Sequence, residues 1–424
     1  MSRYSDQNGV LNASPIWYSH IMRTQRVKKV VIIVGVCTLL FTFLFFIRGK
    51  KSVPRFRIGV SLVDAYRSCI ESTKPQQEKG LCLKELAEYA SRNSTAGEID
   101  TAIGSLTKPD DLAWCHEFMH YAGWGVYKQT KNISNSFAVA SSKCDSGMFH
   151  GIVEEYINEK SEGKEPEQFI ITSAPTACED DVAKNDVLPS GHVKGYCYHG
   201  LGHAFMFITN NDLPRSLRYC DALPPYYSAG CYTGAFMENL QSKQVGRPGT
   251  HPSAYTPKSD DPDYPCNILD NKYRDFCYRY AGIAVGVRTK GDFKEAFASC
   301  LKLSPAYRNI CFWGVGSSIP APQWSSRWAG EKCKLALEVN ADAYRQCILG
   351  GMSFLMQLNL GDPHAVDEFC GAIATNYRDI CYVAAGENFR AWIKSDGDLK
   401  EKCNQLFDIG ARGLCAHGDS RRAK

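Results

Sequence analysis

The sequence predicts an all-helical protein, an array of disulfide-linked helical hairpins that follows a single N-terminal transmembrane helix. Three observations predict this fold class. They are cysteines in regularly spaced pairs, a glycine that recurs after the second cysteine of each pair, and one uncharged apolar segment near the N-terminus. An internal repeat of this kind determines the architecture before any single residue does.

The paired cysteines start at Cys220 and continue to the end of the 424-residue chain. Second cysteines after Cys277 recur every 34 to 36 residues, the length of one helix-turn-helix unit. We expect a disulfide within each pair, and closing a loop of this size contributes about 3 kcal/mol in the chain-entropy model. The expected pairs are Cys220/Cys231, Cys266/Cys277, Cys300/Cys311, Cys333/Cys347, Cys370/Cys381 and Cys403/Cys415.

A Tyr-Arg pair before the second cysteine shows that four consecutive units are homologous. Each unit is expected to hold one helix that ends near the first cysteine, a turn, and a second helix that begins at the second cysteine. The period and hairpin plan resemble those of tetratricopeptide-like and Sel1-like repeats, whose consensus residues are absent here. The resemblance implies an α-solenoid and carries no function. The four pairs are Tyr273-Arg274, Tyr307-Arg308, Tyr344-Arg345 and Tyr377-Arg378.

A glycine follows the second cysteine within three to five residues, inside stretches otherwise apolar enough to be helical. Glycine in a helix interior costs up to about 1 kcal/mol relative to alanine, so its recurrence predicts a close approach of neighbouring helices. These positions are Gly234, Gly282, Gly314, Gly350 and Gly386.

The first half of the chain is a divergent version of the second. Cys69/Cys82 has the same hairpin spacing, while Cys115/Cys144 and Cys178/Cys197 are wider and are paired by elimination. Residues 241–265, rich in proline, glycine, serine and aspartate, are expected to form a non-helical loop. This loop would separate a helical domain at residues 60–240, which contains histidines and cysteines, from a cysteine-paired repeat domain at residues 266–424.

Residues 30–47 carry no charge and are about long enough to span a bilayer as a helix. They contain Cys37 and leave eighteen of the 19 cysteines on their C-terminal side. Because disulfides persist in oxidising compartments, residues 1–29 are expected to be a cytoplasmic tail and residues 48–59 a juxtamembrane linker. The remainder would then be periplasmic, lumenal or extracellular, anchored in a plasma or secretory membrane.

Composition and motifs exclude several functions. A net charge of +4 with mixed signs gives no basic stripe, so nucleic acid is not an expected partner. An even number of cysteines beyond the span argues against a catalytic thiol. The chain contains no phosphate-binding loop, nucleophile elbow, dinucleotide fingerprint or HExxH motif.

Ligand-type side chains cluster on three successive predicted helices, each with two such residues four positions apart and therefore on one face. Histidines in this arrangement can chelate a transition metal such as zinc, copper or iron. The candidate ligands are His116, His120, His150, Glu154, His199 and His203. If a metal supported hydrolysis, Glu117, Glu154 or Glu238 could serve as the catalytic base.

Three functions remain open at this point, the third being a purely structural envelope or junction component. The first is a binding or scaffold surface, the usual role of repeat arrays, with a protein partner on the repeat surface and a possible bound metal. The second is a metal-dependent enzyme, hydrolytic or redox, at the histidine cluster. Equivalent positions on stacked hairpins lie about 10 Å apart, so a shared metal site requires the first helices to approach more closely.

Overall fold

Every regular element in the described part of the chain is helical. A computed structural model describes residues 61–417 except for 72, 107, 163–173, 180–183, 186–187, 189, 242–250, 259, 321–324 and 391–395. The predicted tail, anchor and linker at residues 1–59 lie outside the described residues. Among the helices that are described, none is both long and apolar enough to cross a membrane. The all-helical class is confirmed for the described residues.

Nine disulfides join the described residues, and each follows the expected pairing, including the three pairs of the first half. Their Cα atoms lie 5.3 to 5.7 Å apart, within the usual range for a disulfide. Eight of the bonds tie a helix to the short helix or turn that precedes it, and Cys115–Cys144 joins the start of α6 to the start of α8. Nine disulfides indicate an oxidising, extracytoplasmic environment.

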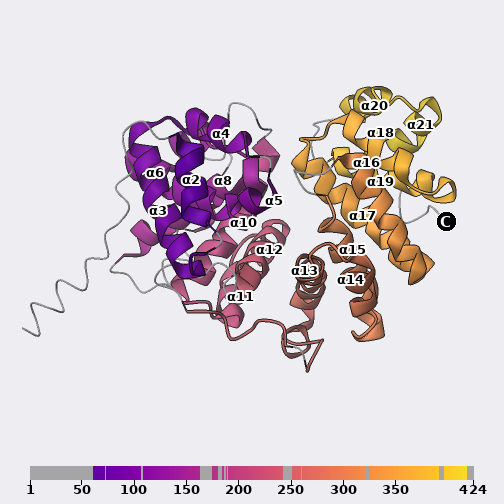
Figure 1. The fold of residues 1–424 in the computed structure, drawn as a ribbon, viewed down its shortest axis with the longest axis horizontal. Helices are drawn as coiled ribbons and strands as arrows, with labels where there is room; N and C mark the ends of the chain where they lie inside the picture. Colours follow the sequence, from indigo (N-terminus) through magenta and orange to yellow (C-terminus); the bar gives the residue numbers. More distant parts are fainter. Residues whose placement is uncertain are drawn as a thin grey trace, which may run out of the picture. The chain divides into compact units, whose positions relative to one another are not determined.

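One helix from each hairpin packs against the corresponding helix of the next hairpin, from α3 through α21 (Figure 1). These helices are α3 (Gln76–Asn93), α6 (Cys115–Thr130), α8 (Lys143–Ser161), α10 (Ser190–Ile208), α12 (Pro225–Gln241), α13 (Asn271–Arg288), α15 (Arg308–Ser317), α17 (Ala341–Leu358), α19 (Arg378–Phe389) and α21 (Ile409–His417). The shorter α-helices are α2 (Leu62–Ile70), α4 (Ala96–Gly104), α5 (Pro109–Leu112), α7 (Ile133–Ala138), α11 (Leu213–Asp221), α14 (Phe293–Cys300), α16 (Ser326–Cys333), α18 (Pro363–Ala372) and α20 (Asp396–Asn404). The 3-10 turns are η1 (Pro175–Cys178), η2 (Cys266–Ile268), η3 (Pro305–Tyr307), η4 (Lys334–Glu338) and η5 (Thr375–Tyr377).

Polar residues at the helix starts explain where several elements begin. Asp292 accepts a hydrogen bond from the backbone of Glu295 at 3.0 Å, and Asn340 accepts one from Ala343 at 2.7 Å. Such N-caps satisfy backbone donors that have no partner within the helix. The described residues between 251 and 265 contain no helix, as expected from their composition.

The arginine of the Tyr-Arg pair closes its own hairpin. The Nε atoms of Arg274 and Arg308 donate to the carbonyl oxygens of Leu269 and Leu303, each at 3.0 Å, and Arg378 makes the equivalent bond at 3.3 Å. The donor and acceptor are five residues apart in every case. The repeated arginine is therefore explained by the turn between the two cysteines.

Asp221 at the end of α11 joins three elements, since it accepts hydrogen bonds from Tyr232 and Tyr273, each at 2.6 Å, and pairs with Lys272 at 2.7 Å. Burial raises the pKa of its carboxyl, but hydrogen bonds from Lys272 and the two tyrosines outweigh burial and hold it below its ordinary value. Because the pKa of Asp221 is lower in the folded protein than in the unfolded chain, its ionised carboxylate stabilises the fold at pH values above the unfolded-state pKa. This stabilisation is lost as the pH falls through the pKa of the folded state.

We therefore expect Asp221→Asn to lower the melting temperature at pH 7. The difference from wild type should shrink steadily below about pH 4, where the unfolded-state carboxyl also protonates. Thermal unfolding of both proteins followed by circular dichroism between pH 7 and pH 2 measures this. A difference that stays constant with pH would contradict the assignment.

Candidate functional site

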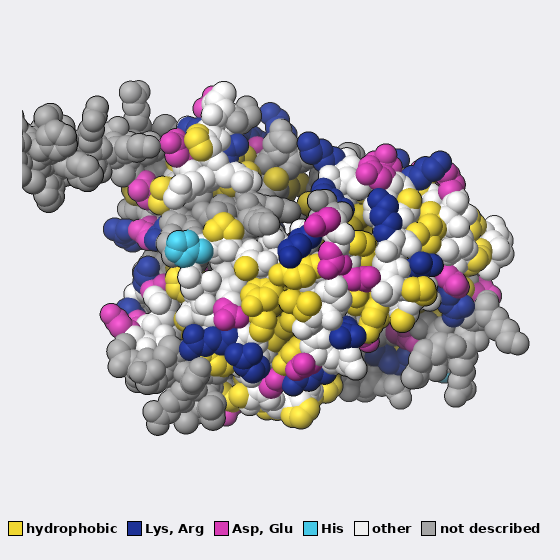
Figure 2. Space-filling view, turned by 90° about the horizontal axis from the view of Figure 1, so that it is seen from below, with side chains coloured by type: hydrophobic (Ala, Val, Ile, Leu, Met, Phe, Trp, Pro, Cys, Tyr) yellow, Lys and Arg dark blue, Asp and Glu magenta, His cyan; other side chains and the backbone are white. Residues whose placement is uncertain are grey.

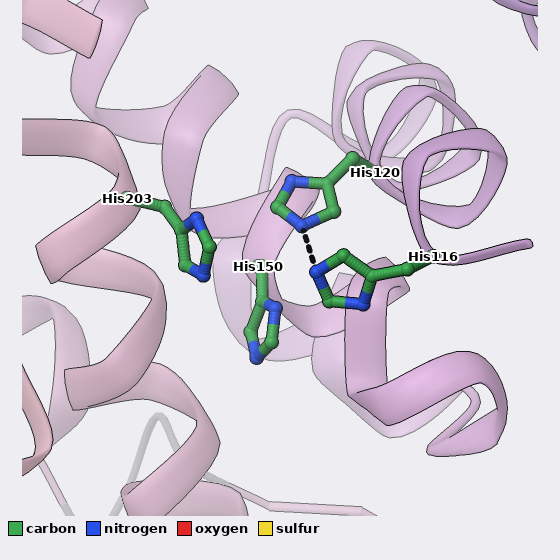
Figure 3. Close-up of side chains that lie close together, drawn as sticks. All are labelled: His116, His120, His150 and His203. Atoms are coloured by element: carbon green, nitrogen blue, oxygen red, sulfur yellow. Dashed lines mark hydrogen bonds between the residues drawn. The ribbon is translucent and has the colours of Figure 1, made fainter. Parts of the chain in front are cut away.

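Four histidines from three helices converge on one point. His116 and His120 come from α6, His150 from α8 and His203 from α10, and one ring nitrogen of each lies within 4.8 Å of the other three (Figure 3). His120 and His203 are fully buried and His150 is 2% exposed, whereas His116 is half-buried. The stacked hairpins thus bring together side chains that are up to 87 positions apart in the sequence (203 minus 116).

His116 and His120 point their Nε2 atoms at each other across 2.9 Å. The Nδ1 of His116 lies 2.8 Å from the carbonyl oxygen of Cys144, and because a carbonyl only accepts, this Nδ1 carries a proton. The Nδ1 of His120 lies 3.0 Å from both carboxylate oxygens of Glu154 and is a donor in the same way. In their neutral forms, both rings therefore present unprotonated Nε2 lone pairs to each other.

The two α10 histidines, His199 and His203, also use Nδ1 for the contact that points away from the cluster. The Nδ1 of His203 lies 2.8 Å from Glu238, on α12. The Nδ1 of His199 lies 2.9 Å from the hydroxyl of Thr233, which itself donates to the carbonyl of Gly230 and so accepts from the imidazole. Outer partners on Nδ1 fix the tautomer and turn the Nε2 lone pair inward, as they do for metal-binding histidines.

Two buried carboxylates flank the cluster. Glu154 accepts a 2.8 Å hydrogen bond from the indole of Trp124 besides its contact with His120. Glu154, Glu238 and His203 form a second group whose ligand-type atoms all lie within 4.8 Å of one another. If Glu154 and Glu238 are both ionised, their charges would balance that of one divalent cation bound to neutral imidazoles.

Burial keeps the imidazoles of His150 and His199 neutral. It lowers the pKa of His150 well below its ordinary value, and the four neighbouring imidazoles lower it further. Burial, with the nearby His116 as a second cause, lowers the pKa of His199 to about 3. The Nδ1 of His150 is also buried with no hydrogen-bond partner among the described residues. Neutral imidazole is the form that binds metals, and a buried polar atom without a partner favours a ligand.

Glycines explain how the helices come close enough. A Cβ on Gly151 of α8 would collide with the carbonyl of His120, and one on Gly234 of α12 would collide with the carbonyl of His199. Gly200 lets α10 approach α8, since its Cβ would lie 3.2 Å from the Cα of His150. The predicted close approach is confirmed, and the same collision with a carbonyl oxygen recurs for Gly282, Gly314, Gly350 and Gly386.

The structure brings together most of the residues expected from the sequence. Glu154 accepts from the Nδ1 of His120 and Glu238 from the Nδ1 of His203, so in this arrangement the two carboxylates orient the imidazole rings. His199 belongs to neither of the two groups of ligand atoms that lie within 4.8 Å of one another. The centroid of its ring is nevertheless 4.7 Å from that of the His150 ring. Glu117 is buried but belongs to neither group.

Sequence reasoning missed three contributors: the Cys144 carbonyl, Trp124 and Thr233. Two of them had a usable signal. Trp124 stands four residues after His120 on one helical face, and Thr233 stands two residues after its cysteine, as His199 does in the preceding hairpin. No sequence signal identifies the Cys144 carbonyl, because a backbone acceptor is defined by the local turn.

The donor set suits a transition metal. Tetrahedral zinc with bonds of about 2.0–2.1 Å to nitrogen would place its ligand atoms about 3.3 Å apart, so the four rings need only small rotations to bind one. Imidazole nitrogens are accepted by zinc, copper and iron, whereas calcium and magnesium require oxygen ligands. The buried His/Glu cluster could therefore hold a metal ion.

No protein-family model, curated protein or solved structure matches this chain. The function is accordingly argued from the chemistry of the site.

Proposed function

We propose that this chain is a membrane-anchored, extracytoplasmic helical-repeat protein that binds a divalent transition metal through His116, His120, His150 and His203. The observation that carries the proposal is the 2.9 Å contact between the Nε2 atoms of His116 and His120 while both Nδ1 atoms donate outward. Two lone pairs at this distance repel unless a cation lies against them, either a proton shared in a hydrogen bond or a metal ion. A metal ion supplies that cation, and Glu154 and Glu238 balance its charge.

The rest of the array, from α13 to α21, then serves as an α-solenoid surface for a protein partner. On the face shown in Figure 2, acidic and basic side chains are interspersed, and hydrophobic side chains gather near the middle. A mixed surface of this kind favours a protein over nucleic acid, which requires a continuous basic region. The anchor at residues 30–47 would hold this surface at the membrane.

A metal-dependent enzyme is the second candidate, and the half-buried state of His116 favours it. Three buried histidines, His120, His150 and His203, would bind the metal, and solvent would enter on the side of His116 and His199. Three protein ligands with one open position are typical of catalytic zinc. Glu154 and Glu238 already contact imidazoles, and Glu117, the third candidate base, is buried but belongs to neither ligand group.

Metal content decides the proposal. The full-length chain, purified without a histidine tag, should contain about one zinc, copper or iron ion per chain by plasma mass spectrometry. Because only the folded state offers the site, the matching metal at 1,000 times its Kd should add about 4 kcal/mol to the free energy of unfolding. Absence of metal after reconstitution with all three ions would contradict the proposal.

A further inference from the structure

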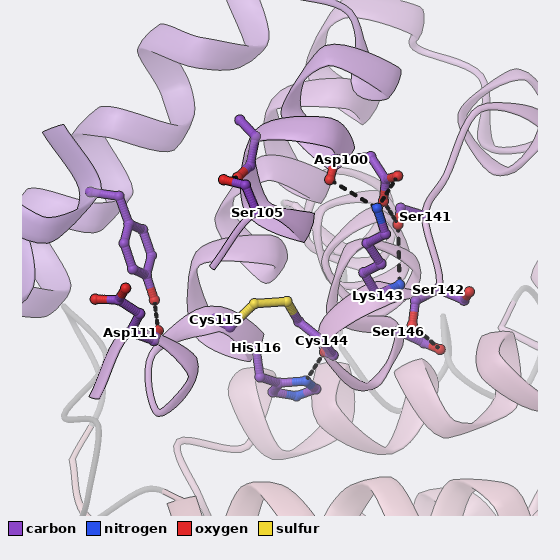
Figure 4. Close-up of a disulfide and its surroundings, with 12 residues drawn as sticks. Asp100, Ser105, Asp111, Cys115, His116, Ser141, Ser142, Lys143, Cys144 and Ser146 are labelled. Carbon is purple, nitrogen blue, oxygen red and sulfur yellow. Dashed lines mark hydrogen bonds and ion pairs between the residues drawn. A yellow bond between two sulfur atoms is a disulfide. The ribbon is translucent and has the colours of Figure 1, made fainter. Parts of the chain in front are cut away.

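We propose that the Cys115–Cys144 disulfide is a redox-sensitive element that positions His116, so that its reduction weakens metal binding. The inference rests on the proposed metal site and names its regulation. Cys115 directly precedes His116 at the start of α6, and Cys144 supplies the carbonyl that holds the Nδ1 of His116 at 2.8 Å (Figure 4). One covalent bond therefore ties the ligand to the group that orients it.

Cys144 is the accessible member of the disulfide set. Seventeen of the eighteen disulfide-bonded cysteines are buried, and Cys144 alone is half-buried. A reductant must reach a sulfur atom in line with the bond, so accessibility determines which disulfide opens first. On this ground the Cys115–Cys144 bond is the one that an external dithiol attacks before the other eight.

The backbone beside this disulfide is held in an unfavourable conformation. Cys144, Asp145 and Ser146 have φ angles of 54°, 53° and 60°, the left-handed region, although none of them is glycine. Each such residue costs about 1–2 kcal/mol relative to a right-handed conformation. A turn of this kind persists only while its surroundings hold it. When the covalent tie is cut, the turn is expected to relax and move the Cys144 carbonyl.

The noncovalent ties to the same turn are weaker. Lys143 forms an ion pair with Asp100 at 2.8 Å, and Ser141 also donates to Asp100 (Figure 4). The side chains of Lys143 and Asp100 are 46% and 28% exposed, and exposed pairs of this type contribute about 0–1 kcal/mol. They offset little of the cost of three left-handed residues, so the disulfide adds a covalent restraint on the turn that these surface contacts do not replace.

The redox step is an ordinary thiol–disulfide exchange. A protein dithiol of the thioredoxin class attacks one sulfur, the bond between Cys115 and Cys144 breaks, and both become thiols. The two electrons and two protons come from the dithiol, which becomes a disulfide. His116 then loses its fixed orientation, and three buried histidines remain for the metal.

The test compares two double variants of the full-length chain. Cys115→Ala/Cys144→Ala removes the proposed element, and Cys370→Ala/Cys381→Ala removes the disulfide between α18 and α19, two helices that carry none of the four clustered histidines. Zinc affinity is measured by competition with a chromophoric chelator, and folding by circular dichroism. We expect the first variant to bind zinc about 10- to 100-fold more weakly, the usual cost of losing an orienting partner, and the second to bind as wild type does.

Equal affinity in both variants would overturn the inference and leave the proposed metal site intact, whereas a wild-type chain that binds no metal would refute the site itself. If the first variant does not fold, the comparison is made on wild-type chain in which only these two cysteines have been reduced, with the same deciding outcomes.

Graded glutathione buffers, acid quenching and mass spectrometry of alkylated cysteines test the order in which the disulfides are reduced. Another disulfide opening first would also overturn the inference.

Discussion

Replacing His120 with alanine is expected to lower the affinity of the chain for its metal by at least about 100-fold. His120 is fully buried, it shares the 2.9 Å nitrogen contact with His116, and Glu154 orients its ring. Loss of an orienting partner alone costs about 10- to 100-fold in metal affinity, and loss of the ligand itself costs more. Glu238→Gln should fall within that smaller range, because it removes only the charge behind His203.

His192→Ala is the matched control for this experiment. His192 lies on α10, the same helix as His203, but belongs to neither ligand group. Burial lowers its pKa to about 4, so it is also a neutral imidazole. Metal titration by calorimetry should show unchanged affinity for His192→Ala. Equal losses in the control and in His120→Ala would mean that the histidines act through folding and not through the metal.

Replacing Gly151 with alanine is expected to destabilise the fold and weaken the metal site together. The added methyl group would collide with the carbonyl of His120, so α6 and α8 must separate. Overpacking of this kind typically costs about 1–3 kcal/mol. The separation also moves His150 away from His116 and His120, so metal affinity should fall although no ligand has been changed.

Gly195→Ala provides the control, because a Cβ at Gly195 on α10 would meet no atom within 4 Å. This substitution should be neutral or should stabilise the protein by up to about 1 kcal/mol, the difference in helix propensity. Denaturant unfolding gives both free energies, and metal titration gives both affinities. A Gly151→Ala protein as stable as Gly195→Ala would show that close helix packing does not set the site.

The helical class and most of the disulfides could be predicted because their signals are local. A cysteine pair with hairpin spacing is expected to close the hairpin that contains it, whereas Cys115/Cys144 and Cys178/Cys197 are wider and were paired by elimination. All nine predicted pairs occur. The recurrent glycines predicted close helix packing, which their contacts with carbonyl oxygens confirm. The histidine pairs were recognised for a similar reason, since residues four apart share a helical face.

The sequence by itself thus determined the helical class, and it predicted most of the disulfides from hairpin spacing and the candidate ligands from helical spacing, because these signals depend on residues close together in the chain. Only the tertiary structure decided that His116, His120, His150 and His203 meet while His199 lies to one side. It also decided that Glu154 and Glu238 face Nδ1 atoms and that Cys144 is the most exposed of the eighteen disulfide-bonded cysteines. Distances between helices depend on backbone contact at the glycines, and exposure depends on which elements cover a turn. Neither quantity is encoded in sequence spacing.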